Sequence, residues 1–425
     1  MRPSLFFLLS STSVLGLVAA AAACGSDGSS SGSSPSDDAG TGTDGTTSTG
    51  DGATGGDGGD SGTACVRTAK DADRARKVVV SHPFLGAGTK GKKYEVLDLS
   101  AAGAITRPGV TFDMGTGLGD DIQFTPDGEI GLVAQDDGSV GVFRFDNGGT
   151  GAPIVIEAAL KGDFYAGRIV IDPTGTRAFV LDSNTQANGG GVYELAIGCD
   201  GKVTSKGLVV PGSTANAMAY LPGDPKQAVL AAGKAFASAA GTDVHLVDLG
   251  ALSLVASGTG FAGDAGTEAI PSSVAVTMDK KFALIADDGA IVGNRVSVVS
   301  LPSMKFVQML PTEYPAKVLT SIHGNAALVL NDDSTDELTV LAYDAANATT
   351  PFTNKGRVAY KFPKPQIPVS AVQITRGTLA GRVILGENVA VRQVQFMPDG
   401  SVIDTAQTPM GSGIPEIVGV VGVQP

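Results

Sequence analysis

Residues 282–299 read FALIADDGAIVGNRVSVV, and this stretch decides the fold because it contains two short apolar segments separated by Gly, Asn and Asp. The first segment covers 282–286 and the second covers 296–299. Short runs of β-branched and apolar residues, bounded by turn-forming residues, are typical of strands. The stretch therefore predicts two neighbouring strands of an antiparallel sheet.

The second segment is one of seven similar four-residue segments in the chain. Their starts are separated by 46, 50, 52, 52, 42 and 53 residues, at 96–99, 142–145, 192–195, 244–247, 296–299, 338–341 and 391–394. No convincing long helical period accompanies them. A repeat of about fifty residues in an all-β chain is typical of a propeller with four strands in each blade. The sequence thus predicts a single seven-bladed β-propeller with four-stranded antiparallel blades.

A second kind of hairpin precedes the last six of these segments. Its turns carry Pro, Gly or Asp, which favour the backbone dihedrals of tight turns, at 126–128, 173–175, 222–223, 279–280, 324–325 and 376–377. Only one strand, 77–80, precedes the first segment, so the first blade lacks its innermost strand. We expect the run 414–421 to pair beside 77–80 and close the ring, which removes exposed sheet edges.

The segments 282–287, 294–299 and 304–307, together with 178–184, resemble seven-bladed propellers of the YVTN type. That group overlaps in structure with the lactonase, or 6-phosphogluconolactonase-like, propellers. The resemblance covers residues 77–425, although the literal Tyr-Val-Thr-Asn tetrad never occurs. It implies a lactonase-like hydrolase of a sugar lactone as one candidate activity. Such an enzyme, acting on a phosphorylated sugar acid, should present Arg or Lys to the anion.

The amino terminus has the features of an export signal. One positive charge in 1–4 precedes the apolar stretch 5–23, which ends in three Ala residues before Cys24. This arrangement resembles the bacterial lipoprotein lipobox, in which the Cys is diacylated and becomes the new amino terminus. Ordinary secretion after cleavage and an uncleaved anchor are the alternatives. The leading expectation is a lipid-anchored protein of the bacterial envelope, on the outer membrane, with the signal peptide at 1–23.

Residues 24–64 are expected to form a disordered linker, and residues 65–425 the propeller. The stretch 25–63 consists of 13 Gly, 9 Ser, 7 Thr, 7 Asp, 2 Ala and 1 Pro, with no large apolar side chain. Such a composition cannot bury enough surface to offset the entropy lost on ordering. Its seven Asp contribute more than half of the net charge of −13.

Composition also limits partners and cofactors. A net charge of −13 disfavours nucleic acid as a partner. The chain has only three His and three Cys, so soft metal ligands are scarce. If Cys24 carries lipid, Cys65 and Cys199 remain as an even pair, which favours one disulfide in an oxidising compartment. Two free thiols are the alternative.

Recurrent acidic residues follow the second strand of several blades: Asp136, Asp137, Asp287, Asp288, Asp332 and Asp333. In a propeller these positions lie on the same face as the connections that enter the innermost strands. Those connections carry Asp121, Glu268 and Glu416, with Arg168 and Lys317 as basic counterparts, and these five residues are the candidate binding site at the channel mouth. Oxygen-rich clusters suit hard cations such as Ca²⁺. The alternative is that Asp simply favours turns.

No standard catalytic set is present. The expected propeller, 65–425, has no Gly-x-Ser-x-Gly elbow, no Cys-x-x-Cys and no P-loop, and its His residues are scattered singly. We therefore expect a binding or scaffold module for an envelope protein, a glycan or a small ligand, without an evident cofactor. The alternatives are the lactonase-like hydrolase and a structural propeller stabilised by a cation.

Overall fold

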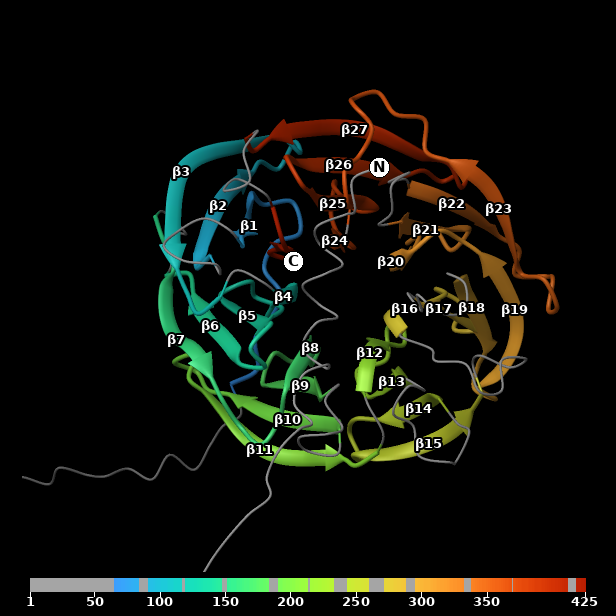
Figure 1. Ribbon diagram of the computed structural model, residues 1–425, viewed down its shortest axis with the longest axis horizontal. Helices are drawn as coiled ribbons and strands as arrows, with labels where there is room; N and C mark the ends of the chain where they lie inside the picture. Colours follow the sequence, from blue (N-terminus) through green and yellow to red (C-terminus); the bar gives the residue numbers. More distant parts are fainter. Residues whose placement is uncertain are drawn as a thin grey trace, which may run out of the picture. The chain divides into compact units, whose positions relative to one another are not determined.

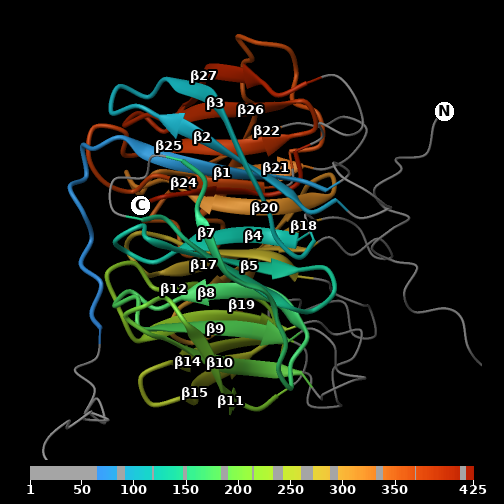
Figure 2. The same cartoon turned by 90° about the vertical axis from the view of Figure 1, so that its left-hand side faces the viewer.

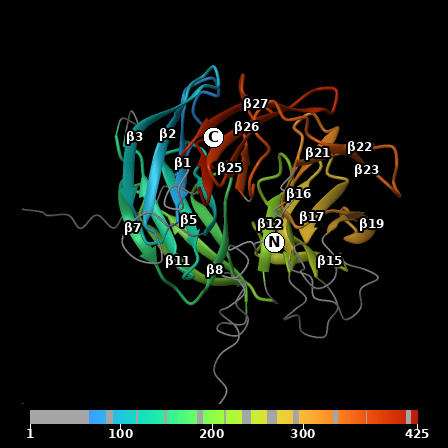
Figure 3. The same ribbon diagram turned by 45° about the horizontal axis from the view of Figure 1, so that its top comes forward.

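The computed structural model describes residues 65–83, 91–116, 119–146, 151–182, 190–212, 215–232, 243–259, 271–287, 295–331, 338–368, 370–411 and 418–425. These residues form seven four-stranded sheets arranged around a central axis (Figures 1 and 3). Every strand pairing in these sheets is antiparallel. The predicted seven-bladed propeller is confirmed. The described part of the chain contains no helix, so none in it could cross a membrane.

Within each blade the strands run from the innermost to the outermost in the following order. Blade 1 contains β28 (Val421–Val423), β1 (Arg76–His82), β2 (Lys93–Leu99) and β3 (Ile105–Asp113); blade 2 contains β4 (Gly119–Phe124), β5 (Ile130–Gln135), β6 (Val140–Arg144) and β7 (Ile154–Leu160); blade 3 contains β8 (Ala166–Ile171), β9 (Arg177–Asp182), β10 (Gly191–Ile197) and β11 (Val203–Val210); blade 4 contains β12 (Ala215–Tyr220), β13 (Gln227–Ala232), β14 (Val244–Asp248) and β15 (Ser253–Gly258).

The remaining three blades follow the same order. Blade 5 contains β16 (Pro271–Val276), β17 (Phe282–Asp287), β18 (Arg295–Ser300) and β19 (Lys305–Pro311); blade 6 contains β20 (Pro315–Thr320), β21 (Ala326–Asn331), β22 (Leu338–Tyr343) and β23 (Phe352–Arg357); blade 7 contains β24 (Ser370–Gln373), β25 (Arg382–Glu387), β26 (Ala390–Phe396) and β27 (Val402–Pro409).

The hydrophobic core is divided among the interfaces between neighbouring blades. Seven clusters of buried apolar side chains are found among the described residues, one at each interface around the ring. The second strand of a blade is covered on both sides, and all six residues of β5, β17 and β21 are buried. Outermost strands such as β15 and β23 are largely exposed. Sheets that stack face to face therefore explain the continuous apolar runs of the inner strands.

The ring closes where the carboxyl-terminal strand β28 joins the first blade (Figure 3). Val421 and Val423 pair with Val80 and Val78 of β1. The expected pairing is confirmed, but the strand lies further along the chain than the run 414–421 predicted. The amide of Ser81 donates to the carbonyl of Val420, just before the strand begins. Residues 414–417 of the predicted run lie outside the described residues.

The two faces of the ring differ in what they carry. The entry face carries the amino-terminal ends of the innermost strands. The turn face carries the hairpin turns, such as 125–129, that join innermost and second strands. Residues 65–75, here called the strap, run across the turn face before β1 begins (Figure 2, blue). The strap is tied to blade 3 by a disulfide between Cys65 and Cys199, whose Cα atoms are 5.3 Å apart.

Candidate binding site at the channel mouth

The innermost strands share an irregularity near their first residues. The pairing register with the second strand shifts once in β4, β8, β12, β16 and β20, which leaves extra residues such as Gly167, Asn216, Ser272 and Ala316 in the innermost strand. A β-bulge of this kind bends the strand and redirects nearby side chains, and bulges are frequent beside functional sites. In five blades, the side chains of the innermost strand therefore change direction at the same level of the channel, next to the entry face.

An ion pair crosses the channel at this level. Lys317, on β20 of blade 6, places its Nζ 2.5 Å from Oδ1 of Asp121, on β4 of blade 2. Around the ring, β24 and β28 lie between these strands on one side, and β8, β12 and β16 on the other (Figure 1). The two side chains therefore meet from nearly opposite walls. Each keeps about an eighth of its surface exposed.

Arg168 completes the group from a third blade. Its Nη1 lies 3.5 Å from Oδ2 of Asp121, and the side chain is one-fifth exposed. Both carboxylate oxygens of Asp121 thus face a cation. Charge-assisted contacts to a carboxylate are stronger than neutral hydrogen bonds, more so where water is partly excluded. Three side chains from blades 2, 3 and 6 therefore form one polar centre in the channel.

Three of the five residues expected at the channel mouth are brought together in this centre: Asp121, Arg168 and Lys317. Glu268 and Glu416, the other two, lie outside the described residues. The sequence placed all five on one face from the propeller topology alone. It could not show which would touch, because Asp121 and Lys317 are 196 residues apart.

The acidic residues after the second strands are engaged by neighbours where the structure describes them. Asp137 accepts from Lys161 Nζ at 3.2 Å and from Ser139. Burial alone would raise the pKa of Asp137, but these partners outweigh it and lower that pKa below its usual value. Asp287 lies 3.1 Å from Nε of Arg295, and both side chains are buried. Each described acid therefore has a local structural role.

Asp136 also lies beside a neighbouring side chain, because the Tyr165 hydroxyl donates to its backbone carbonyl. The other candidate metal ligands, Asp288, Asp332 and Asp333, lie outside the described residues. Within the described ranges, no group of three or more His, Cys, Asp or Glu side chains gathers as a cation site would require. The proposed Ca²⁺ site therefore remains a prediction.

The three His residues all lie away from the innermost strands. His82, on β1, has its Nε2 3.1 Å from Glu95, and both side chains are almost fully buried. His245, on β14, bonds through Nδ1 to Ser257 at 2.8 Å, and burial lowers its pKa. His323 lies in a turn between β20 and β21. No imidazole therefore stands beside Asp121 as a catalytic base.

One polar residue near the start of an innermost strand was not predicted as a site residue from the sequence. Asn216, in the bulge of β12, has a buried Oδ1 with no hydrogen-bond partner among the described residues. A single polar residue in an apolar strand carries no motif, so only the recurring bulge identifies this position.

No protein-family model and no curated protein matches this chain. Solved structures do match. One is a provisionally assigned 6-phosphogluconolactonase from Bacteroides fragilis NCTC 9343, with 12% identity, a TM-score of 0.59 and coverage of 83% of this chain and 99% of that chain. Another is the periplasmic gluconolactonase PpgL of Pseudomonas aeruginosa, with 14% identity, a TM-score of 0.59 and coverage of 82% and 99%.

A third match is a functionally unknown protein from Desulfotomaculum acetoxidans DSM 771, with 15% identity and a TM-score of 0.53 over 82% of this chain and 98% of that one. The structural neighbours thus include lactonase-like propellers, as the sequence resemblance suggested. At such low identity, the likeness shows the shared seven-bladed fold alone.

Proposed function

We propose that this protein is a lipid-anchored envelope propeller that binds a small polar ligand at its channel mouth. The ion pair between Lys317 and Asp121 is the observation that carries the proposal. Charged groups lose hydration when they are partly buried, and blade packing alone does not require a pair across the channel. Partly buried charges that converge from different elements are a common feature of binding sites.

Lys317 also has unused hydrogen-bonding capacity. An ammonium group has three N–H donors, and among the described residues Lys317 has one acceptor, Asp121. Two donors are therefore available for ligand oxygens. Hydroxyl and carboxylate groups, such as those of a sugar acid, match these donors and the neighbouring Arg168.

Binding fits this geometry better than hydrolysis does. A hydrolase needs a group that can take a proton from water. Asp121 is the carboxylate at the centre of the cluster, and each of its oxygens faces a cation. The three His residues of the chain lie on other strands or in a turn. The arrangement therefore supplies donors for an oxygen-rich ligand more readily than a base.

A lactonase-like hydrolase is the second candidate. The structural neighbours that bear gluconolactonase names favour it, since hydrolysis of such a lactone would yield a sugar acid with the chemistry that Lys317 and Arg168 could bind. The two candidates differ in whether the protein turns the lactone over.

Calorimetry with gluconate and a hydrolysis assay with glucono-1,5-lactone separate the two candidates. We expect gluconate to bind and Lys317→Met to weaken it by about tenfold, the loss of one charge-assisted hydrogen bond. Lys206→Met removes an exposed Lys from blade 3 and should leave binding unchanged. If the wild-type protein consumes the lactone faster than it hydrolyses spontaneously, and Lys317→Met does not, the hydrolase is favoured. If no sugar acid binds, the channel-mouth proposal fails.

The lipid anchor has its own test. Cys24, the preceding apolar stretch and the following Gly25 motivate it. Intact mass of membrane-purified protein should show a chain beginning at Cys24 with acyl groups, and Cys24→Ser should release the protein from the membrane. Two signals are usually needed for stable anchoring, and a diacylated Cys supplies two chains. A soluble protein that begins at another residue would contradict the proposal.

A further inference from the structure

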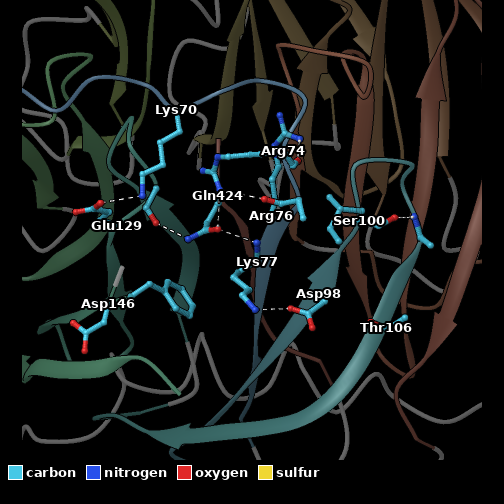
Figure 4. Close-up of a pocket in the computed structure, with 15 residues that line it drawn as sticks. Lys70, Arg74, Arg76, Lys77, Asp98, Ser100, Thr106, Glu129, Asp146 and Gln424 are labelled. Atoms are coloured by element: carbon cyan, nitrogen blue, oxygen red, sulfur yellow. Dashed lines mark hydrogen bonds and ion pairs between the residues drawn. The ribbon is translucent and has the colours of Figure 1, made fainter. Parts of the chain in front are cut away.

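A cavity lies on the turn face, between blades 1 and 2 (Figure 4). Its volume is about 480 Å³, within the range of small-molecule sites. Its wall combines the end of the strap and the start of β1 with the β2–β3 turn, the hairpin turn at 128–129, the end of β6 and Gln424. The cavity is on the face opposite the channel mouth, so its ligand would be separate from the one proposed above.

Two lysines of this cavity are already neutralised. Lys70 Nζ lies 2.9 Å from Glu129, and Lys77 Nζ lies 2.6 Å from Asp98 (Figure 4). These pairs are partly exposed, so each contributes little to stability. At the cavity wall, the positive charges of these two lysines are therefore balanced by the negative charges of the two carboxylates.

Two guanidinium groups in the same wall have no Asp or Glu partner in the part of the chain that the structure describes. Neither Arg74 nor Arg76 pairs with an Asp or Glu side chain of the described residues. Arg76 donates only to backbone carbonyls, whereas Arg74 donates to the Ala75 carbonyl, to Gln424 and, at 3.3 Å, to an oxygen of the carboxyl-terminal residue Pro425. The Nε atoms of both are buried and have no hydrogen-bond partner among the described residues. Arg76 is only 2% exposed. Buried donors that lack an acceptor cost free energy, which a bound acceptor would recover.

A third guanidinium adds to this charge. The carbonyl of Arg376 accepts from Arg76 at 3.5 Å, which brings Arg376 beside it. Burial, followed by repulsion from Arg74 and Arg376, lowers the pKa of Arg76. Burial and Arg376 likewise lower the pKa of Arg74. Asp71, Asp73 and Asp127 act in the opposite direction and raise these pKa values, but the net shift of both arginines is downward. Like charges gathered at low dielectric repel one another, so this part of the turn face would gain stability from a further counter-ion.

We propose that this cavity is a binding site for a small oxyanion, a carboxylate or a phosphate, held by Arg74 and Arg76. Guanidinium groups present N–H donors in a fork that matches both kinds of anion. The nearby Asp146, which pairs with Arg144 at 3.4 Å, is the one cavity-lining acid not matched to Lys70 or Lys77. It should limit the affinity rather than supply a contact.

Calorimetric titrations at low ionic strength, with inorganic phosphate in one arm and succinate in the other, test the site. We expect saturable binding in at least one arm, and the arm that binds identifies the anion. Arg74→Gln should weaken this binding by about tenfold, as expected for loss of a charged hydrogen-bonding partner. Arg74 is half-buried, so this variant should fold even if a change at the almost fully buried Arg76 does not.

Two controls separate a built site from general electrostatic attraction. Lys206→Gln removes the same unit of charge from an exposed position on blade 3, and should leave the affinity unchanged. Asp146→Asn should tighten binding by about two- to fivefold, because it removes a repelling charge. The proposal is overturned if neither anion saturates, or if Lys206→Gln weakens binding as much as Arg74→Gln.

Discussion

At the scale of single residues, the hairpin turns show how the repeat constrains its sequence. Gly128, Gly175 and Gly324 occupy matching turn positions with φ between 69° and 73°, a left-handed conformation that glycine adopts without a Cβ clash. In blade 5 the matching residue is Lys280, with φ of 59°. Each of these residues donates its amide to the carbonyl three positions earlier. Blade 5 therefore holds the turn despite an unfavourable residue.

Replacing Lys280 with Gly should stabilise the protein. The change removes the cost of a left-handed non-glycine residue, about 1 to 2 kcal/mol, and adds flexibility to the unfolded chain, about 0.5 to 1 kcal/mol. We expect a net gain of about 0.5 to 1 kcal/mol, measured by urea unfolding. Gly175→Ala is the converse test and should destabilise by at least a similar amount. If Lys280→Gly were destabilising, the turn would depend on the Lys side chain.

Residue-scale chemistry was only partly predictable from the sequence. The positions of Asp121, Arg168 and Lys317 at strand entries followed from the repeat, but their contact depends on ring curvature, which the sequence does not display. Asp287 was a candidate metal ligand, whereas the structure pairs it with Arg295, eight residues later on the adjacent strand. The guanidinium cluster on the turn face was missed, since Arg74 and Arg376 are brought together only by ring closure.

At the scale of elements, the strap is held to several blades. Arg67 lies 2.9 Å from Asp127 in the first hairpin turn of blade 2 and donates to the carbonyls of Gly198 and Cys199. The backbone amide of Thr378, in blade 7, donates to Asp73 at 2.6 Å. The strap thus connects blades 2, 3 and 7 and contributes Lys70 and Arg74 to the wall of the turn-face cavity.

Acid should loosen the strap at Asp127. Burial alone would raise the pKa of Asp127, but hydrogen bonds from Thr125, the Glu129 amide and Arg67 outweigh it and lower that pKa. Because its pKa is lower in the folded state, ionised Asp127 stabilises the folded protein at pH values above its unfolded-state pKa of 3.8. This contribution is lost as the pH falls through the folded-state pKa. The protection of the amides of residues 65–75 from hydrogen exchange, measured against the intrinsic rate at each pH, should therefore be high at pH 7 and fall below about pH 4.

Asp127→Asn should make strap exchange fast already at pH 7, because the buried Arg67 loses its nearer carboxylate, at 2.9 Å, and keeps only Glu129 at 3.8 Å. Asp399→Asn, in an exposed turn of blade 7, is the control and should leave strap exchange unchanged. Equal exchange in wild type and Asp127→Asn at pH 7 would show that other contacts hold the strap.

The disulfide should hold the same element. It encloses a sequence separation of 134 residues, for which the chain-entropy model gives an upper value of about 4 to 5 kcal/mol. The double replacement Cys65→Ser and Cys199→Ser should lower the unfolding free energy by several kcal/mol and weaken anion binding at the turn face. Alkylation of both thiols in denatured, non-reduced protein would show that purified protein lacks the bond.

At the scale of the whole molecule, the fold was predictable because a ring of similar blades imposes one period on the sequence. Strands buried on both faces repeat every fifty residues or so, and this signal survives even without a literal family motif. The closing strand was the weak point, and its predicted run began too early. Three residues, Val421–Val423, are enough to pair with β1 because the flanking Val420 and Gln424 continue the contacts.

Removing residues 418–425 should therefore open the ring rather than merely fray an end. Val418, Val421 and Val423 belong to the core between blades 7 and 1, and Val420 to the core between blades 1 and 2. Burying a Val side chain is worth about 1.5 to 3 kcal/mol, so four of them are worth about 6 to 12 kcal/mol, comparable to the 5 to 15 kcal/mol that stabilises a typical domain. The backbone groups of β1 also lose their partners, which adds to the cost.

Thermal unfolding of this truncation should show either no cooperative transition or a melting temperature lowered by more than about 10 °C. Removal of 424–425 alone keeps β28 and both cores, and costs the side-chain contacts of Gln424 to the Lys77 amide and the Gly128 carbonyl. It should therefore lower the melting temperature by only a few degrees. A melting temperature within a degree or two of wild type after the longer truncation would mean that the remaining six innermost strands hold the ring without β28, and that closure is not a source of its stability.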